Sequence, residues 1–222
     1  MTALSRLLNG CPLLPIIQTE TPQQAVDIAA ALAQGGVSAV EVVLRTPKAL
    51  DAISAIRSAL PSVLVGAGTV LNAAQAQDCK NAGAQFLVSP ASTPALLQAM
   101  IDTGLPLAPG VSTVSEMAMA HEMGLNELKF FPANLSGGTP MLNAVRSILQ
   151  QVRFCPTGGI SAANLTEYLS LPNVFVVGGS WLTPADLVKA GDYTAITALA
   201  AESVRLANVC LAEKSAPLRK SA

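Results

Sequence analysis

Residues 126–133 read NELKFFPA, a short apolar stretch that carries one lysine, Lys129, between Leu128 and Phe130. The run is bounded by Gly124 and Pro132, which predicts a buried strand. An unpaired ammonium is costly in such a setting. Burial also lowers the pKa of an amine and so makes a neutral nucleophile available. We therefore expect the rest of the chain to surround Lys129 with a carboxylate, an arginine and a phosphate site.

Apolar segments of strand length alternate with helical patterns along the whole chain. The segments expected to be strands are residues 12–18, 37–45, 63–70, 86–90, 105–111, 126–133, 152–156 and 173–177. Helix-start signals follow most of them, namely Thr21-Pro22, Thr46-Pro47, Thr93-Pro94, the capping box Thr113 to Glu116, and Thr183-Pro184. Eight such units predict an α/β fold, a closed parallel (β/α)8 TIM barrel.

We expect residues 1–222 to form one domain, with a short leading helix at residues 2–9 and a frayed end after Cys210. The alternative is an open doubly wound sheet. Its nucleotide-binding version is weakened because the turn after the first strand has no Gly-x-Gly-x-x-Gly pattern.

Composition excludes several classes of partner. The chain is 51% hydrophobic and only 12% charged, with a net charge of -1 and no basic block, which argues against nucleic acid. No apolar run approaches the roughly 18 residues that a membrane span needs. Four cysteines lie far apart without a CxxC pair, which favours free thiols in a reducing, cytoplasmic compartment over disulfides or zinc.

Polar residues fall where the expected strands end, which is where barrel enzymes carry their sites. Glu41 and Arg45 are four apart and would share a strand face, and Thr69 follows Gly68. Glycine-rich turns after the last two strands, Gly158-Gly159 and Gly178-Gly179-Ser180, are typical of a barrel phosphate site. An amine, a carboxylate and an arginine beside a phosphate site together indicate a phosphorylated 2-keto acid.

Each of these candidate site residues also has a purely structural interpretation. Lys129 and Glu41 would also suit a buried ion pair with no catalytic role, and Glu41 would also suit a pair with Arg45. Glycines in such loops usually serve tight turns. His121 is expected to be an ordinary surface or packing residue. Arg153 lies near the start of its strand, the stability end, and is left out of the site.

Four segments resemble the 2-keto-3-deoxy-6-phosphogluconate (KDPG) aldolase family, which includes the 4-hydroxy-2-oxoglutarate (KHG) aldolases. They are EVVLRT at 41–46, VGAGTV at 65–70, KFFPA at 129–133 and RFCPTGGI at 153–160. The resemblance runs from about Pro12 to about Leu206. It departs at Val43, where the family often has threonine, and at residues 134–136, where an acidic, alanine-rich segment is common.

The resemblance implies a Schiff-base (class I) aldolase of the Entner–Doudoroff pathway. Such an enzyme cleaves KDPG to pyruvate and glyceraldehyde 3-phosphate, with no metal or other cofactor, and is usually a cytoplasmic homotrimer. It implies that Lys129 forms the imine, that Glu41 is the general acid/base, and that Arg45 holds the substrate carboxylate. It also places Thr69, Pro90, Phe131 and Thr157 at the substrate, and Gly158, Gly159, Gly179 and Ser180 at the phosphate.

Other functions stay open from sequence. The galactonate isomer of KDPG and the shorter KHG share every imine contact, and oxaloacetate decarboxylation would use the same imine. A phosphosugar isomerase or a sugar-phosphate binding barrel would keep the phosphate turns without an imine. A metal-dependent aldolase would need a ligand cluster that the sequence does not suggest.

Overall fold

The computed structural model describes residues 3–215, in which helices follow strands along the chain. The strands are β1 (Leu13–Ile17), β2 (Ala39–Val43), β3 (Leu64–Gly68), β4 (Leu87–Val88), β5 (Leu107–Ala108), β6 (Gly110–Val111), β7 (Glu127–Phe130), β8 (Arg153–Pro156) and β9 (Val177–Gly179). The helices are α1 (Leu4–Leu8), α2 (Pro22–Gln34), α3 (Ala49–Ala59), α4 (Ala73–Asn81), α5 (Pro94–Asp102), α6 (Val114–Glu122), α7 (Gly138–Val145), α8 (Leu165–Leu169), α9 (Ala185–Ala190) and α10 (Tyr193–Ser215).

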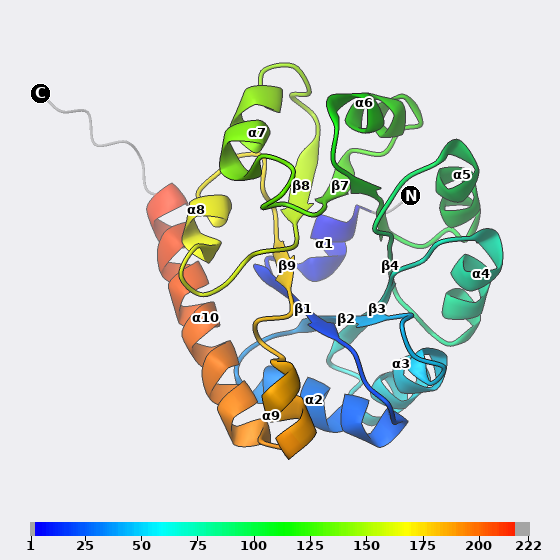
Figure 1. The fold of residues 1–222 in the computed structure, drawn as a ribbon, viewed down its shortest axis with the longest axis vertical. Helices are drawn as coiled ribbons and strands as arrows, with labels where there is room; N and C mark the ends of the chain where they lie inside the picture. Colours follow the sequence, from blue (N-terminus) through cyan, green and yellow to red (C-terminus); the bar gives the residue numbers. More distant parts are fainter. Residues whose placement is uncertain (1–2, 216–222) are drawn as a thin grey trace, which may run out of the picture.

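Every strand pairing is parallel, and the sheet curls so that the helices lie outside it (Figure 1). One sheet has the order β5-β4-β3-β2-β1-β9, and a second has the order β6-β7-β8. Only Pro109 separates β5 from β6, so the expected fifth strand is divided in two. Isolated bridges, Phe154 to Val174 and Thr157 to Gly178, link β8 to the β9 side. The fold class is therefore α/β with a curved parallel sheet.

Strand boundaries correct two expectations. The expected second strand reaches Arg45, but β2 ends at Val43 and Arg45 lies in the turn that follows, where its N–H donates to the Val43 carbonyl. Because Arg45 is off the strand, alternation along β2 does not set its direction. At the other end of the chain, β9 begins at Val177, so Gly178 and Gly179 are strand residues rather than loop residues.

The threonine caps are confirmed at three helices and wrong at two. Thr21, Thr93 and Thr113 each accept a backbone N–H of the first helical turn. Thr46 and Thr183 do not cap, because each hydroxyl donates to another segment: Thr46 to the carbonyl of Thr19 in the loop after β1, and Thr183 to the carbonyl of Ile16 near the end of β1. These two threonines therefore tie the loops at the ends of β1, β2 and β9 together.

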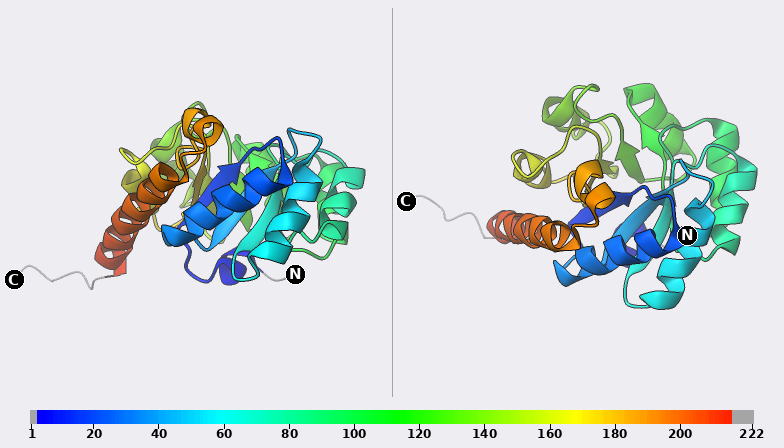
Figure 2. Two further views of the ribbon diagram at one scale, coloured as in Figure 1. Left: turned by 90° about the horizontal axis from the view of Figure 1, so that it is seen from below. Right: turned by 60° about the horizontal axis from the view of Figure 1, so that its bottom comes forward.

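The inner face of the curved sheet has its own apolar cluster, separate from the larger core between sheet and helices. Members from the strands include Ala39, Val88 and Cys155, and α1 adds Leu4 and Leu8. In the left view of Figure 2, α1 (dark blue-violet) lies below the strands, at the end where they begin. Helix α1 thus closes one end of the interior, and the expected leading helix is confirmed over Leu4–Leu8.

Helix α10 runs the length of the molecule beside α2 and α8 (Figure 1). It continues to Ser215, so the expectation of fraying after Cys210 is wrong up to that residue, and residues 216–222 lie outside the described part. Residues Tyr193–Lys214 are long and apolar enough to cross a membrane by length and composition, which the search for apolar runs did not anticipate. Ile196, Ala200 and Ala207 are buried against the rest of the domain, as in a packed surface helix.

Candidate active site

Lys129 and Glu41 both point into the interior of the curved sheet, because each occupies a strand position whose side chain faces inward. Glu41 is two residues after Ala39 on β2, and Ala39 belongs to the inner cluster. Lys129 on β7 is the register partner of Cys155 on β8, which also belongs to it. Alternation along each strand therefore directs both side chains to the same enclosed space.

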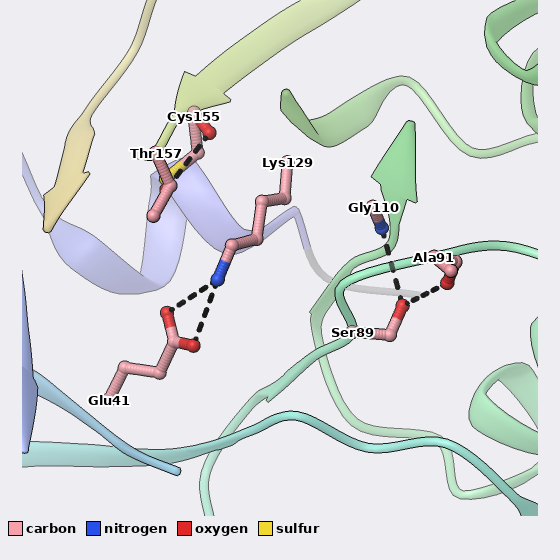
Figure 3. A network of polar contacts seen from close by, with 7 residues as sticks. All are labelled: Glu41, Ser89, Ala91, Gly110, Lys129, Cys155 and Thr157. Atoms are coloured by element: carbon pink, nitrogen blue, oxygen red, sulfur yellow. Dashed lines mark hydrogen bonds and ion pairs between the residues drawn. The ribbon is translucent and has the colours of Figure 1, made fainter. Parts of the chain in front are cut away.

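The two side chains form a buried ion pair (Figure 3). Lys129 Nζ donates to Glu41 Oε1 at 3.0 Å and to Oε2 at 3.4 Å. The lysine side chain is 6% exposed and the carboxylate is fully buried. Lys129 Nζ also lies 5.5 Å from the centroid of the Phe131 ring. The site thus holds a desolvated amine within proton-transfer distance of a carboxylate, and Glu41 pairs with Lys129 rather than with Arg45.

Glycine in β3 makes room for the carboxylate. A Cβ on Gly68 would lie 2.0 Å from Glu41 Oε1 and 2.6 Å from its Cγ. The next residue, Thr69, has a φ of 61°, which is strained for a β-branched side chain. Such strain persists only where the surrounding structure fixes the backbone. This backbone conformation sets the direction of the Thr69 side chain, which follows β3, the strand next to the one that carries Glu41.

Thr157 and Cys155 lie on the other side of Lys129 (Figure 3). Both are buried, and the Cys155 thiol lies 3.8 Å from the Thr157 hydroxyl. Burial raises the pKa of the Cys155 thiol to about 12, with Glu41 adding to the rise and Lys129 opposing it. Cys155 is therefore a neutral thiol at physiological pH. The sequence analysis did not identify Cys155 as part of the site, because a single cysteine in an apolar strand does not indicate which side chains will surround it.

Ser89 is a second residue near the ion pair that the sequence analysis did not identify. Its hydroxyl donates to the Ala91 carbonyl at 2.8 Å and accepts the Gly110 N–H at 3.3 Å. A Cβ on Gly110 would lie 2.3 Å from the Pro90 carbonyl carbon, so β6 packs directly on the Pro90 turn. Ser89 thus fixes Pro90 against the strand beside β7. A serine before proline was visible in the sequence, but its partner 21 residues away was not.

The two glycine turns expected to hold phosphate come together through the bridge between Thr157 and Gly178. Gly158 and Gly159 have φ values of +99° and +74°, which only glycine adopts without strain. A Cβ on Gly179 would meet the Trp181 ring at 2.4 Å. Gly178 likewise leaves room for the Thr157 hydroxyl. These glycines therefore serve close packing as well as any anion.

Within residues 3–215, no hydrogen bond or ion pair joins Arg45 to Lys129 or Glu41. Arg45 is exposed, and among the described residues it forms no ion pair. It lines a cavity of about 480 Å³ together with Gln18, Thr19, Ser180, Thr183 and Lys189. Arg45 and Ser180 thus share one cavity at the ends of β2 and β9.

His121 and Arg153 lie elsewhere, as expected. His121 Nδ1 is 2.6 Å from Asn126 Oδ1, and Arg153 pairs with Glu127 at the α1 end of the strands. Among residues 3–215, no group of three or more His, Cys, Asp or Glu side chains is placed to hold a metal ion.

Comparisons with known proteins agree with this geometry. A family model described as KDPG and KHG aldolase matches residues 4–199. The chain is 50% identical over 203 residues to the KHG/KDPG aldolase of Escherichia coli (strain K12), which covers 91% of this chain and 95% of the relative. It is 47% identical, with the same coverage, to the 2-dehydro-3-deoxy-phosphogluconate aldolase of Dickeya dadantii (strain 3937).

A solved structure is similar over almost the whole fold. It is the KDPG aldolase of Legionella pneumophila with pyruvate captured at low pH as a covalent carbinolamine intermediate. The identity is 43%, the TM-score is 0.87, and the match covers 90% of this chain and 97% of that one.

Proposed function

Because the chain belongs to the KDPG and KHG aldolase family, we propose that Lys129 forms the imine and that Glu41 moves the protons of its reaction. The protein is a Schiff-base aldolase, a carbon–carbon lyase of the Entner–Doudoroff type, which cleaves KDPG to pyruvate and glyceraldehyde 3-phosphate. The observation that carries the residue assignment is the buried contact of 3.0 Å between the amine and the carboxylate. The same site would cleave KHG to pyruvate and glyoxylate.

The ion pair supplies the first step. Transfer of a proton from Lys129 to Glu41 leaves a neutral amine, which attacks the C2 ketone of KDPG, and a carboxylic acid. The acid then protonates the carbinolamine hydroxyl, which leaves as water and gives the iminium. Glu41 is again a carboxylate at this point. A purely structural pair would show the same distances, so trapping of the imine is what separates the two roles.

Cleavage uses the iminium as the electron sink. Glu41, directly or through a water, removes the proton of the C4 hydroxyl, and that oxygen becomes the aldehyde of glyceraldehyde 3-phosphate. The electron pair of the C3–C4 bond moves to C3 and gives the enamine. Protonation at C3 restores an iminium, and its hydrolysis releases pyruvate and the free amine of Lys129. No step calls for a metal or an organic cofactor.

We assign the remaining binding roles from the motifs and from the side chains around the pair. Thr69, Thr157, Phe131 and the Pro90 turn border the ketone and carboxylate end. Arg45, at the cavity with Ser180, offers a guanidinium to the substrate carboxylate. Gly158, Gly159, Gly179 and Ser180 bind the phosphate through backbone N–H groups and one hydroxyl.

The test is borohydride reduction in the presence of pyruvate, followed by peptide mass spectrometry. We expect one pyruvyl adduct on Lys129, and we expect the variant Lys129→Ala to stay folded and to lose almost all KDPG cleavage. Lys48→Ala is the matched control, because Lys48 is exposed and its ion pair within residues 3–215 is with Asp51 on the surface. An adduct on surface lysines, or substantial cleavage by Lys129→Ala, would sink the assignment.

We also propose that the eight strand–helix units close into a single (β/α)8 barrel. The sequential strand order, the strand divided at Pro109 and the bridges from β8 toward β9 support closure. One continuous domain is supported by the single larger core that runs from Leu13 to Cys210.

A cytoplasmic homotrimer is proposed for the assembled enzyme. The low charged fraction supports a subunit interface, and so do large apolar side chains exposed on this chain. These are Leu71, Val114, Leu135, Ile148 and Val209. Four buried free thiols support a reducing compartment. Sedimentation velocity at micromolar concentration tests the trimer.

A further inference from the structure

The two reacting groups lie on different sheets. Glu41 is on β2, in the six-stranded sheet whose edge is β5, and Lys129 is on β7, in the three-stranded sheet whose edge is β6. Pro109 separates β5 from β6 and has no N–H to donate to a neighbouring strand. The distance between the amine and the carboxylate therefore depends on how the two sheets are joined.

One serine contacts the backbone on both sides of Pro109. Ser89 follows β4, and its N–H donates to the carbonyl of Ala108, the last residue of β5, at 3.4 Å. Its hydroxyl accepts the N–H of Gly110, the first residue of β6, at 3.3 Å (Figure 3). Ser89 thus joins the edges of the two sheets where the proline interrupts the strand.

We propose that Ser89 is a positioning residue for the reaction: its hydroxyl joins the sheet that carries Glu41 to the sheet that carries Lys129 and so holds the amine at its distance from the carboxylate. The proposal rests on the proposed function, which assigns the proton transfers to this pair. Within residues 3–215, no hydrogen bond joins Ser89 to either group, so it acts through β6 and β7.

The hydroxyl is committed to this junction. Its single hydrogen is donated to the Ala91 carbonyl at 2.8 Å, so the oxygen is left to accept the Gly110 N–H. Ser89 is fully buried, and a Cβ on Gly110 would lie 2.4 Å from the Pro90 carbonyl oxygen, so β6 packs against the turn with no side chain between them. Without the hydroxyl, the buried Gly110 N–H loses its acceptor, and β6 must shift to find another.

A shift of β6 is passed directly to Lys129. Gly110 is the register partner of Lys129, and the Lys129 N–H donates to the Pro109 carbonyl at 2.9 Å. Glu41 is held separately, because β2 pairs with β3 and Glu41 is the register partner of Gly66. The amine and the carboxylate therefore do not shift together when β6 moves.

A second junction between the sheets lets a Ser89 variant stay folded. The bridges Phe154 to Val174 and Thr157 to Gly178 join β8 to the β9 side without Ser89. Loss of the Ser89 hydroxyl therefore loosens one of two junctions, and it should displace Lys129 rather than unfold the chain.

The test compares Ser89→Ala with the unaltered full chain. Each enzyme is mixed with saturating pyruvate and reduced with borohydride at timed intervals, and mass spectrometry measures the rate at which the pyruvyl adduct forms on Lys129 and its final amount. We expect the rate to fall by roughly tenfold, because displacement of a reacting group by about 1 Å costs on the order of a hundredfold and a smaller shift costs less. The final amount per chain should stay unchanged. The kcat values for KDPG and KHG should fall by the same factor, because both substrates react at the same ketone.

Thr103→Val is the matched control. Thr103 is 4% exposed, and its hydroxyl donates to the Met100 carbonyl at 2.7 Å and accepts the Leu105 N–H at 3.2 Å. Valine therefore removes the same two kinds of hydrogen bond near the start of β5, away from the junction. We expect this variant to lose stability in urea and to keep the unaltered rate of adduct formation.

Ser89→Cys is a second variant, which fills the space with a sulfur that accepts hydrogen bonds only weakly, and we expect its rate to fall by roughly threefold. It carries the test if Ser89→Ala does not fold. An unchanged rate in the folded variants, the same fall in Thr103→Val, or a loss in the final amount alone would overturn the role of Ser89. Failure of the proposed function gives a different result: the unaltered enzyme itself would then form no pyruvyl adduct on Lys129.

Discussion

At the scale of single residues, the position of Glu41 depends on Gly68, which has no side chain and lies on the neighbouring strand β3. Alanine at Gly68 would place Cβ 2.0 Å from Glu41 Oε1, so the carboxylate must leave its present position beside Lys129. A misplacement of about 1 Å at a reacting group costs on the order of a hundredfold in rate. We expect Gly68→Ala to lower kcat by about that factor, measured on folded protein with KDPG.

Gly66 provides the control for that change. It lies on the same strand and its added Cβ would meet the Phe86 ring at 2.1 Å, not Glu41. Both variants overpack the interior and should lose roughly 1–3 kcal/mol of stability. If Gly66→Ala lowers kcat as much as Gly68→Ala, general distortion rather than displacement of Glu41 explains the loss.

Two buried thiols give stability a defined dependence on pH. Burial raises the pKa of Cys79 to about 12, and Asp78 adds to the rise; the Cys155 thiol shows a similar value. Below about pH 9 both thiols are neutral in the folded and unfolded chains. Between pH 9 and 12 the unfolded chain releases their protons while the folded chain retains them, so stability falls as pH rises.

Urea unfolding at pH 8, 9 and 10 measures this effect. Each such thiol contributes a slope of up to about 1.4 kcal/mol per pH unit. We expect Cys79→Ala to lose stability less steeply above pH 9 than the unaltered protein, whatever its stability at pH 8. Parallel curves for the two proteins would contradict the raised pKa of Cys79.

At the scale of elements, the start of α6 is fixed by reciprocal hydrogen bonds. Thr113 accepts the Glu116 N–H, and the Glu116 carboxylate accepts the N–H groups of Ser112 and Thr113. Burial alone would raise the pKa of Glu116, but these bonds outweigh it and lower the pKa. We expect Thr113→Ala to reduce the free energy of unfolding by about 1 kcal/mol, with exposed Thr194→Ala as a control that loses less.

The elements also explain what the sequence could and could not predict. Periodicity and the Thr-Pro and capping-box signals are local, and they located the strands and the starts of α2, α5 and α6. The direction of Arg45, the hydrogen bonds of Thr46 and Thr183 to other segments, and the break at Pro109 depend on contacts across neighbouring units. The same holds for the site: Lys129 was visible as a charge in an apolar strand, whereas the contacts of Ser89 and Cys155 arise only when strands lie side by side.

At the scale of the whole molecule, helix α1 and the Lys129–Glu41 pair lie at different levels of one interior. Helix α1 closes the end where the strands begin, and its N-terminus is tied to β7 because the Ser5 N–H donates to Glu127 at 2.9 Å. Leu8 is 2% exposed and packs in the inner cluster with Phe86 and Cys155. Lys129 lies two residues further along β7 than Glu127, toward the ends of the strands.

Leu8→Ala should therefore separate the two properties. Removal of a buried leucine side chain costs roughly 2–5 kcal/mol, whereas the Lys129–Glu41 pair makes no direct contact with α1 in the described hydrogen bonds. We expect a large loss in the free energy of unfolding by urea, with kcat of the folded variant within about twofold of the unaltered enzyme, because positioning of the pair comes from β2, β3 and β7. Glu122→Ala, at an exposed position of α6, should change neither quantity. A large fall in kcat alongside the loss of stability would mean that helix α1 also positions the Lys129–Glu41 pair.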